Sequence, residues 1–203
     1  MEIAPAPDMY LDWLDLAAAP GFAGVTGRFG MTILPGRRCS GKTAKEPRDI
    51  ERDVTALAAI GVDAFVLLVE DHELIACGVP TFTTVFADHG ILVIRCPIVD
   101  HRTPRDRSSA ARPLSQPPHS GHPVPAPGDT AAFDDLVRSV ETRLHTGETL
   151  AVSCHGGLGR TGTLAACLLK LGGLDAEAAM AVVRRTRPGA IDHASQEAFV
   201  RGW

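Results

Sequence analysis

The feature that most constrains the fold is a set of short apolar runs that alternate with helical patterns. Ala64–Val69 and Ile91–Ile94 are continuously apolar, which is typical of parallel strands that are buried on both faces. The segments around them place apolar residues at helical spacing instead. Strands that alternate with helices predict an α/β fold, here a three-layer sandwich with a mostly parallel central sheet of four or five strands.

The same patterns place the individual elements along the chain. We predict strands at residues 29–34, 62–69, 91–94 and 149–153. We predict helices at residues 47–60, 72–77, 81–89, 129–145, 160–171, 176–187 and 193–203. Residues 1–22 read as a loosely structured lead-in, in which residues 10–16 form one or two helical turns.

Composition limits the size of the protein and its partners. A chain of 203 residues with 45% hydrophobic residues is enough for a real core, and we expect one domain over residues 1–203. The net charge of −4 argues against binding of nucleic acid through overall charge. The apolar runs are too short to span a membrane, and the acidic, proline-broken start does not resemble a signal peptide. We therefore expect a cytoplasmic monomer with no nucleic-acid or membrane partner.

One segment has a different texture from the rest. Residues 97–127 hold eight of the fifteen prolines and almost no large apolar residues. Four arginines fall in its first half, at positions 102, 105, 107 and 112. We predict a loop insert at about residues 102–127 within the domain, because a loop this long inside a compact domain is usually functional or disordered.

The strongest chemical signal is a cysteine between a short strand and a helix. Cys154 is followed by a glycine-rich loop and then by Arg160 at the sixth position after it. Glycines let backbone N–H groups converge on an anion, and the N-terminus of the following helix adds positive potential. That field favours the thiolate of Cys154 as a nucleophile. Arg160 can grip two phosphate oxygens, and Thr161 can donate its hydroxyl to the departing sulfur.

Two other segments match phosphate-site patterns, of which the first is rejected and the second is less favoured. Cys96 also has an arginine at the sixth position, but its loop lacks glycine, Pro97 has no N–H, and Asp100 would place an anion in an anion cradle. Gly36–Thr43 fits the nucleotide-binding pattern G-x-x-x-x-G-K-[ST]. That mechanism needs a helix to begin at Gly41–Lys42, whereas Pro47 predicts a later helix start. A nucleotide-binding enzyme is therefore the less favoured alternative.

The chain resembles the cysteine-dependent protein tyrosine and dual-specificity phosphatases. Within them it is similar to the kinase-associated phosphatases of the cyclin-dependent-kinase inhibitor type and their bacterial relatives. The resemblance runs from about residue 30 to residue 199, except for the insert. Ser153 stands where these families usually have a histidine. The matching segments are Leu34–Gly36, Asp63–Leu74, Pro97–Asp100, Cys154–Thr161 and Arg187–Ile191, with Gln196 and Phe199.

The resemblance implies a cysteine phosphatase fold and assigns Asp100 as general acid. The residues agree, because Asp100 follows a buried strand and a carboxyl group is needed to protonate the leaving oxygen. Gln196 resembles the glutamine that places the attacking water. The alternatives are a loop aspartate that caps a turn and a solvated helix residue. The expected phosphate-binding residues are His155, Gly156, Gly157, Leu158, Gly159 and Arg160.

The expected reaction is hydrolysis of phosphomonoesters through a cysteinyl-phosphate intermediate. The expected partner is a phosphorylated protein, with phosphotyrosine preferred and phosphoserine or phosphothreonine tolerated. We expect no metal and no cofactor, because the anion cradle supplies the charge stabilisation. A phosphate-binding module without turnover is the other alternative.

The remaining cysteines give no framework of their own. Five cysteines without short-spaced pairs predict neither a disulfide scaffold nor a zinc site. Two interpretations of Cys77 and Cys96 stay open: buried core residues, or protective disulfide partners of Cys154.

Overall fold

A five-stranded sheet organises the protein, which is described here from a computed structural model covering residues 9–39, 47–100, 102–105 and 129–203. The strand order is β1-β2-β5-β3-β4, and every neighbouring pair except β1 with β2 is parallel. The strands are β1 (Asp12–Trp13), β2 (Arg28–Thr32), β3 (Ala64–Leu67), β4 (Leu92–Arg95) and β5 (Thr149–Ser153).

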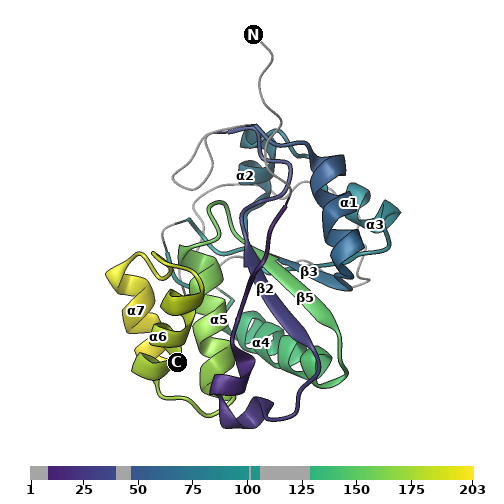
Figure 1. The fold of residues 1–203 in the computed structure, drawn as a ribbon. Coiled ribbons are helices and arrows are strands. Elements are labelled where there is room, and N and C mark those ends of the chain that lie inside the picture. The colour runs from purple at the N-terminus through teal and green to yellow at the C-terminus, as the bar shows by residue number, and fades with distance from the viewer. Residues whose placement is uncertain (1–8, 40–46, 101, 106–128) are drawn as a thin grey trace.

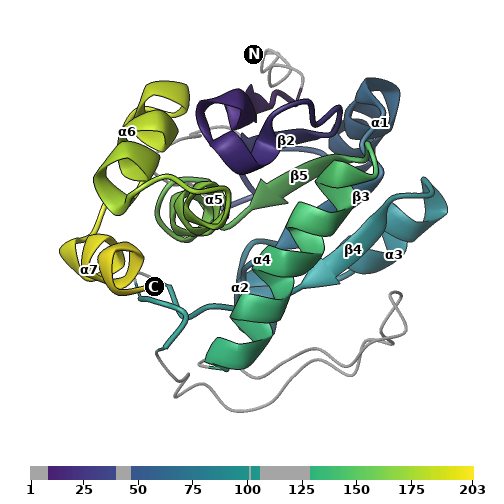
Figure 2. The ribbon, with the colours of Figure 1, turned by 90° about the horizontal axis from the view of Figure 1, so that it is seen from below.

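Helices cover both faces of this sheet. Figure 1 shows α1 and α3 together on one side and α4 to α7 on the other, so the predicted α/β sandwich with a mostly parallel sheet is confirmed. Figure 2 shows α4 running along the second face, with α5 beside it. The helices are α1 (Ile50–Ile60), α2 (Asp71–Ala76), α3 (Phe82–Asp88), α4 (Thr130–His145), α5 (Gly159–Leu171), α6 (Ala176–Thr186) and α7 (Ala194–Gly202).

The lead-in departs from the prediction of helical turns at residues 10–16. Asp12 and Trp13 form the edge strand β1, which pairs antiparallel with Gly30 and Met31 of β2. Two 3-10 turns follow, at Leu16–Ala18 and Pro20–Phe22. The two-residue strand is too short for a sequence pattern, and its pairing partner supplies the hydrogen bonds that stabilise it.

Side-chain caps explain where the predicted helix starts were shifted. The helix expected from residue 47 begins at Ile50, because the Asp49 side chain accepts a hydrogen bond from the backbone N–H of Arg52 at 2.9 Å. A capping oxygen satisfies an N–H group that has no partner within the helix. Asp129 caps α4 in the same way through Ala132 N–H, so α4 begins one residue later than predicted.

The sheet gathers three segments at one edge. Ser153 at the end of β5 lies level with Thr32 of β2 and Leu67 of β3. The chain leaves these parallel strands as the loop after β2, the loop after β5 and the segment leading to α2. Ligand sites in open parallel sheets form at this carboxyl edge. Within the described residues no helix is long and apolar enough to cross a membrane.

Candidate active site

Cys154 lies at the carboxyl edge of the sheet, immediately after β5, and it is buried. The loop 155–158 follows and leads directly into α5. Gly157 has a positive φ of 67°, and a Cβ there would lie 2.0 Å from the Thr32 carbonyl oxygen. A Cβ at Gly159 would lie 2.6 Å from Asp192 Oδ1. Position 157 therefore requires glycine, because its neighbour is backbone, whereas a Cβ at Gly159 would require the Asp192 and Gln196 side chains to move.

Hydrogen bonds from three residues on two segments fix two carbonyl groups of this loop. The His155 carbonyl accepts from Arg37 Nη1 at 3.2 Å and from the Leu34 N–H at 3.3 Å. The Gly156 carbonyl accepts from Arg187 Nη2 at 3.2 Å. Because these carbonyl groups are bonded to the surrounding segments, the N–H groups of the loop can converge on an anion.

Arg160 enters the same site from the first turn of α5 and is only 2% exposed. Its Nη1 and Nη2 atoms donate to the two carboxylate oxygens of Glu73 at 2.7 and 2.8 Å. Nη1 also donates to the Ile98 carbonyl at 2.9 Å. The guanidinium group is therefore held in one orientation by a fork of charge-assisted hydrogen bonds.

The surroundings of Arg160 keep it charged. Burial by itself lowers the pKa of the guanidinium group, but its hydrogen bonds to Glu73 and the nearby charge of Cys154 raise that pKa by more. The resulting pKa lies above its usual value. A fixed, buried cation beside a cysteine is suited to stabilise negative charge that develops on a bound oxyanion.

Asp100 also reaches Arg160, from the segment that follows β4. Its Oδ1 lies 2.8 Å from Arg160 Nη2, and its side chain is 48% exposed. A carboxyl group that is both half-exposed and within the site can exchange protons with solvent and with a bound ligand. The structure thus brings together Cys154, Arg160 and Asp100, as the sequence predicted for a site built on these three residues.

Two further predicted residues are buried beside this site. Gln196 in α7 is 1% exposed, and its amide would contact a Cβ placed on Gly159 at 2.7 Å. Its Nε2 donates to the Arg102 carbonyl at 3.4 Å. Thr161 is fully buried, and among the described residues its Oγ1 has no hydrogen-bond partner. The O–H group of this buried hydroxyl is therefore available to donate a hydrogen bond to a ligand or a thiolate.

His155 and Leu158 complete the predicted loop. His155 is half-buried, and its pKa is lowered by burial first and by the charge of Arg37 second. Its imidazole is therefore neutral near pH 7. Leu158 caps the N-terminus of α5, and its carbonyl accepts from the Ile191 N–H at 3.3 Å and from Gly162 N–H at 2.9 Å.

Sequence analysis assigned no role to Glu73, Arg37 or Arg187. Glu73 stands at the third position of α2, three residues after Glu70, and this pair forms a capping box. One sequence signal could have identified Glu73. It is an acidic pair with this spacing directly after a buried strand, which places a carboxylate near the edge of the sheet. Arg37 and Arg187 gave no such signal, because their side chains contact the loop by donating to the backbone carbonyl groups of the loop.

The structure also bears on the rejected segments. Burial, with a smaller contribution from Asp129, raises the pKa of the Cys96 thiol to about 12, so Cys96 is not a nucleophile near neutral pH. The first helix described after β2 begins at Ile50, and the helix start that the nucleotide-binding alternative needs, at Gly41–Lys42, falls outside the described residues. Lys42 and most of the predicted insert, residues 106–127, lie outside the described residues.

The cysteine spacing predicted no disulfide framework, but the structure contains one disulfide that the spacing did not predict. Cys39, in the loop after β2, is joined to Cys77 at the end of α2. Cys77 is thus not a partner of Cys154, and Cys154 and Cys96 are both free thiols. The two joined cysteines are 38 residues apart, so only the fold brings them together.

Comparisons with known proteins agree with this geometry. A family model described as the DSP-PTPase phosphatase domain of the Swiss Army Knife type, PTP-SAK, matches residues 125–200. A crystal structure of kinase associated phosphatase, with its catalytic-site cysteine replaced by serine, superposes with a TM-score of 0.75 at 23% identity. It covers 96% of this chain and 93% of that one. These matches together support the dual-specificity phosphatase superfamily for this chain.

Other proteins are also similar to this chain. Human (Homo sapiens) cyclin-dependent kinase inhibitor 3 is 24% identical over 161 residues, which is 79% of this chain and 61% of that protein. The matched region thus spans about three fifths of that relative, and 53% of its counterpart in the pig, Sus scrofa. The structure of Tk-PTP in its active form has a TM-score of 0.61 at 25% identity, and covers 91% of this chain and 95% of that one.

Proposed function

We propose that this phosphatase domain hydrolyses phosphomonoesters on proteins through a cysteinyl-phosphate intermediate. Phosphotyrosine is the proposed first substrate, with tolerance of phosphoserine and phosphothreonine. The observation that carries the proposal is the guanidinium group of Arg160, held by Glu73 beside the glycine-rich loop that follows Cys154. A forked cation next to a cradle of backbone N–H groups matches the geometry of a phosphoryl group.

The first step transfers the phosphoryl group to the enzyme. The Cys154 thiolate attacks phosphorus, a sulfur–phosphorus bond forms, and the bond to the leaving oxygen breaks. Arg160 and the N–H groups of residues 155–159 stabilise the equatorial oxygens. Asp100 donates its proton to the leaving oxygen, which departs as a neutral hydroxyl group.

The second step regenerates the thiolate. Asp100, now a carboxylate, accepts a proton from a water molecule that Gln196 positions. The water oxygen attacks phosphorus, the sulfur–phosphorus bond breaks, and inorganic phosphate is released. The buried Thr161 hydroxyl donates a hydrogen bond to the departing sulfur, which lowers the cost of forming a buried anion.

The proposed partner is a phosphorylated protein. Two relatives carry names that refer to kinases, cyclin-dependent kinase inhibitor 3 and kinase associated phosphatase. We extend from them only the class of substrate, a phosphoprotein. A monomeric chain and a cytoplasmic location belong to the same proposal.

Hydrolysis of an aryl phosphate in the presence of EDTA tests the proposal. Wild type is expected to turn over, and Cys154→Ser is expected to lose turnover while keeping affinity for phosphate, because the cradle consists of backbone and Arg160. Cys96→Ser serves as the matched control and should retain full activity. Retained activity in Cys154→Ser would overturn the mechanism. Phosphate binding without turnover in wild type would instead identify a binding module.

A further inference from the structure

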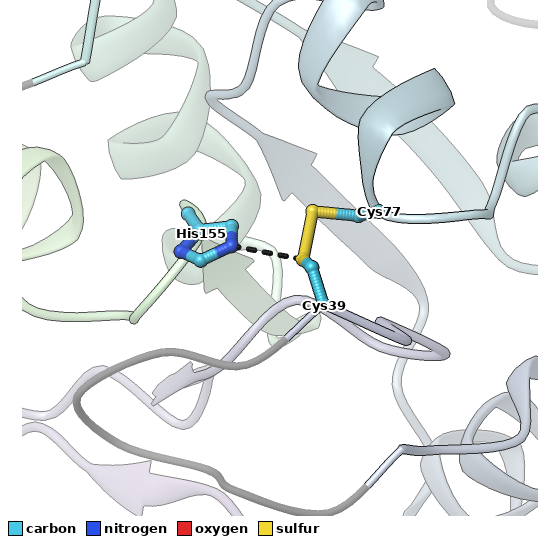
Figure 3. A group of neighbouring side chains, drawn as sticks. All are labelled: Cys39, Cys77 and His155. Atoms are coloured by element: carbon cyan, nitrogen blue, oxygen red, sulfur yellow. Dashed lines mark hydrogen bonds between the residues drawn. A yellow bond between two sulfur atoms is a disulfide. The ribbon is translucent and has the colours of Figure 1, made fainter.

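Three side chains that take no part in the proposed reaction gather on one side of the loop of residues 155–158, called the phosphate loop below (Figure 3). They are Cys39 from the loop after β2, Cys77 from the end of α2 and His155 from the phosphate loop. Their sulfur and nitrogen atoms all lie within 4.8 Å of one another. His155 directs Nε2 at Cys39 Sγ, at 3.1 Å, so the imidazole ring faces the pair of sulfurs.

The donor types in this cluster select a particular class of metal ion. Two thiolates and an imidazole suit Zn²⁺, whereas Mg²⁺ and Ca²⁺ prefer carboxylate and carbonyl oxygens. Zn²⁺ takes thiolate sulfur at about 2.3 Å and imidazole nitrogen at about 2.0–2.1 Å in a tetrahedral arrangement. Donors around one such ion lie about 3.6–3.8 Å apart, and these three atoms all lie within 4.8 Å of one another.

The surroundings of His155 prepare its ring as a ligand. Its Nε2 atom lies 3.1 Å from Cys39 Sγ, so the ring already points at the sulfur pair. Its backbone carbonyl is held by Arg37 and Leu34, which fixes the residue beside the sulfurs. Sulfur is only a weak hydrogen-bond acceptor, so Cys39 does little for this nitrogen in the disulfide form.

The two cysteines stay close in either redox state. Their Cα atoms are 4.9 Å apart. A backbone hydrogen bond also joins the two segments that carry them, because the N–H of Arg38 donates to the Cys77 carbonyl at 2.9 Å. Cleavage of the sulfur–sulfur bond therefore leaves two thiols side by side. Such thiols persist in a reducing compartment.

We propose that the reduced form of this cluster is a Zn²⁺ site, with the thiolates of Cys39 and Cys77 and Nε2 of His155 as its protein ligands. A dithiol reductant supplies two electrons and two protons to the disulfide, forming two thiols, and is itself oxidised to a disulfide. Zn²⁺ then displaces both thiol protons to solvent and accepts the imidazole lone pair. Three protein ligands leave the fourth tetrahedral position to water or another donor.

This assignment makes the disulfide and the metal mutually exclusive, because each uses both sulfurs. An occupied site would join the loop after β2, the end of α2 and the phosphate loop through one ion. Since His155 follows Cys154 and α2 carries Glu73, the metal would connect directly to the two segments that hold the proposed catalytic groups. Binding of the metal itself does not depend on the proposed reaction.

Metal titration of the whole chain tests the site, with Cys154→Ser as the background so that the proposed nucleophile cannot bind the ion. Phosphine-reduced, metal-free protein is titrated with Co²⁺ alone under nitrogen, and then with Zn²⁺. We expect one Co²⁺ per chain with a thiolate-to-cobalt absorption band that Zn²⁺ abolishes. Cys39→Ser and Cys77→Ser should each lose about half of the band intensity or all of it. His155→Gln should weaken binding about tenfold or more.

Two controls keep the result decisive. Cys96→Ser removes a buried thiol outside the cluster and should bind Co²⁺ like the parent protein. The oxidised parent, in which Cys39 and Cys77 are joined, should bind no Co²⁺ even though its sequence is unchanged. This second comparison remains informative if a cysteine variant fails to fold. Equal binding by oxidised and reduced protein, or an unchanged band in Cys39→Ser, would overturn the proposal.

Discussion

Glu73 holds Arg160 through both of its carboxylate oxygens, at 2.7 and 2.8 Å from the two terminal guanidinium nitrogens. The same carboxylate accepts a hydrogen bond from the Glu70 N–H at 2.8 Å, which caps α2. One side chain therefore both starts a helix and orients the buried cation of the proposed phosphate site. This double use ties the stability of α2 to the geometry of Arg160.

Removal of the Glu73 charge should destabilise the fold and weaken the site together. Breaking a buried ion pair leaves an uncompensated charge, so Glu73→Gln should lower the free energy of unfolding by about 3 kcal/mol. Urea denaturation measures this value, and phosphate affinity measures the loss of Arg160 orientation. Glu51→Gln is the matched control, because Glu51 is also in a first helical turn but its side chain is 65% exposed. Equal effects of the two changes would contradict a special role for Glu73.

Thiol reactivity should divide the free cysteines by their surroundings. Burial raises the pKa of Cys96 to about 12, so the Cys96 thiolate fraction is on the order of 10⁻⁴ at pH 8 and rises only as the pH approaches that value. Burial also raises the pKa of Cys167. We expect iodoacetamide to modify Cys154 in the native protein and to leave Cys96 and Cys167 unmodified. Mass spectrometry of the peptides measures each site.

Two comparisons control the alkylation result. Protein reduced and unfolded in urea should be modified at all five cysteines, which shows that each peptide is detectable. Inorganic phosphate should slow modification of Cys154 alone, since it would occupy the proposed cradle. Labelling of Cys96 as fast as that of Cys154 would contradict both the burial argument and the assignment of the nucleophile.

Arg160→Lys tests whether the fork of hydrogen bonds matters beyond its charge. Lysine offers a point charge and cannot bind two carboxylate oxygens and a phosphoryl group in one plane. We expect a loss of about 2–4 kcal/mol of transition-state stabilisation, roughly 30- to 900-fold in kcat/KM. Arg138→Lys, on the exposed face of α4, is the control. A change in kcat/KM of less than a few-fold would remove Arg160 from the site.

Local patterns were sufficient to predict much of the fold. The bounds of β5 were predicted to the residue, because its apolar run is flanked by a polar helix end and by the glycine-rich loop. Strand β3 is shorter than the predicted strand, residues 62–69, because only Ala64–Leu67 pair with strands on both sides. Hydrophobicity marks what is buried, whereas pairing decides what is strand.

Contacts between distant residues explain what the sequence did not predict. Glu73 and Arg160 are 87 residues apart, and Cys39 and His155 are 116 apart. The order of strands in the sheet brings such residues together, and no local pattern encodes that order. Cys154, Arg160 and Asp100 were predictable because two of them share one loop and the third follows a buried strand.

Asp100 occupies part of the proposed phosphate site. Its carboxylate oxygen Oδ1 lies 2.8 Å from Nη2 of Arg160, the residue that the proposed mechanism gives to the phosphoryl group. A phosphate that binds this nitrogen therefore competes with the carboxylate. Protonated Asp100 is the form that the first chemical step requires.

Asp100→Asn should therefore separate proton transfer from phosphate binding. With poor leaving groups, the loss of the acid should slow hydrolysis by about 10²–10⁴-fold. Good leaving groups need little proton transfer, so their first step should slow far less, and inorganic phosphate should inhibit more strongly because no carboxylate competes for Arg160. Steady-state kinetics over a series of aryl phosphates measures both effects, with Asp88→Asn, exposed at the end of α3, as the control. An equal loss for good and poor leaving groups would make Asp100 a structural residue and would direct the search for the acid to Asp106, which lies outside the described residues.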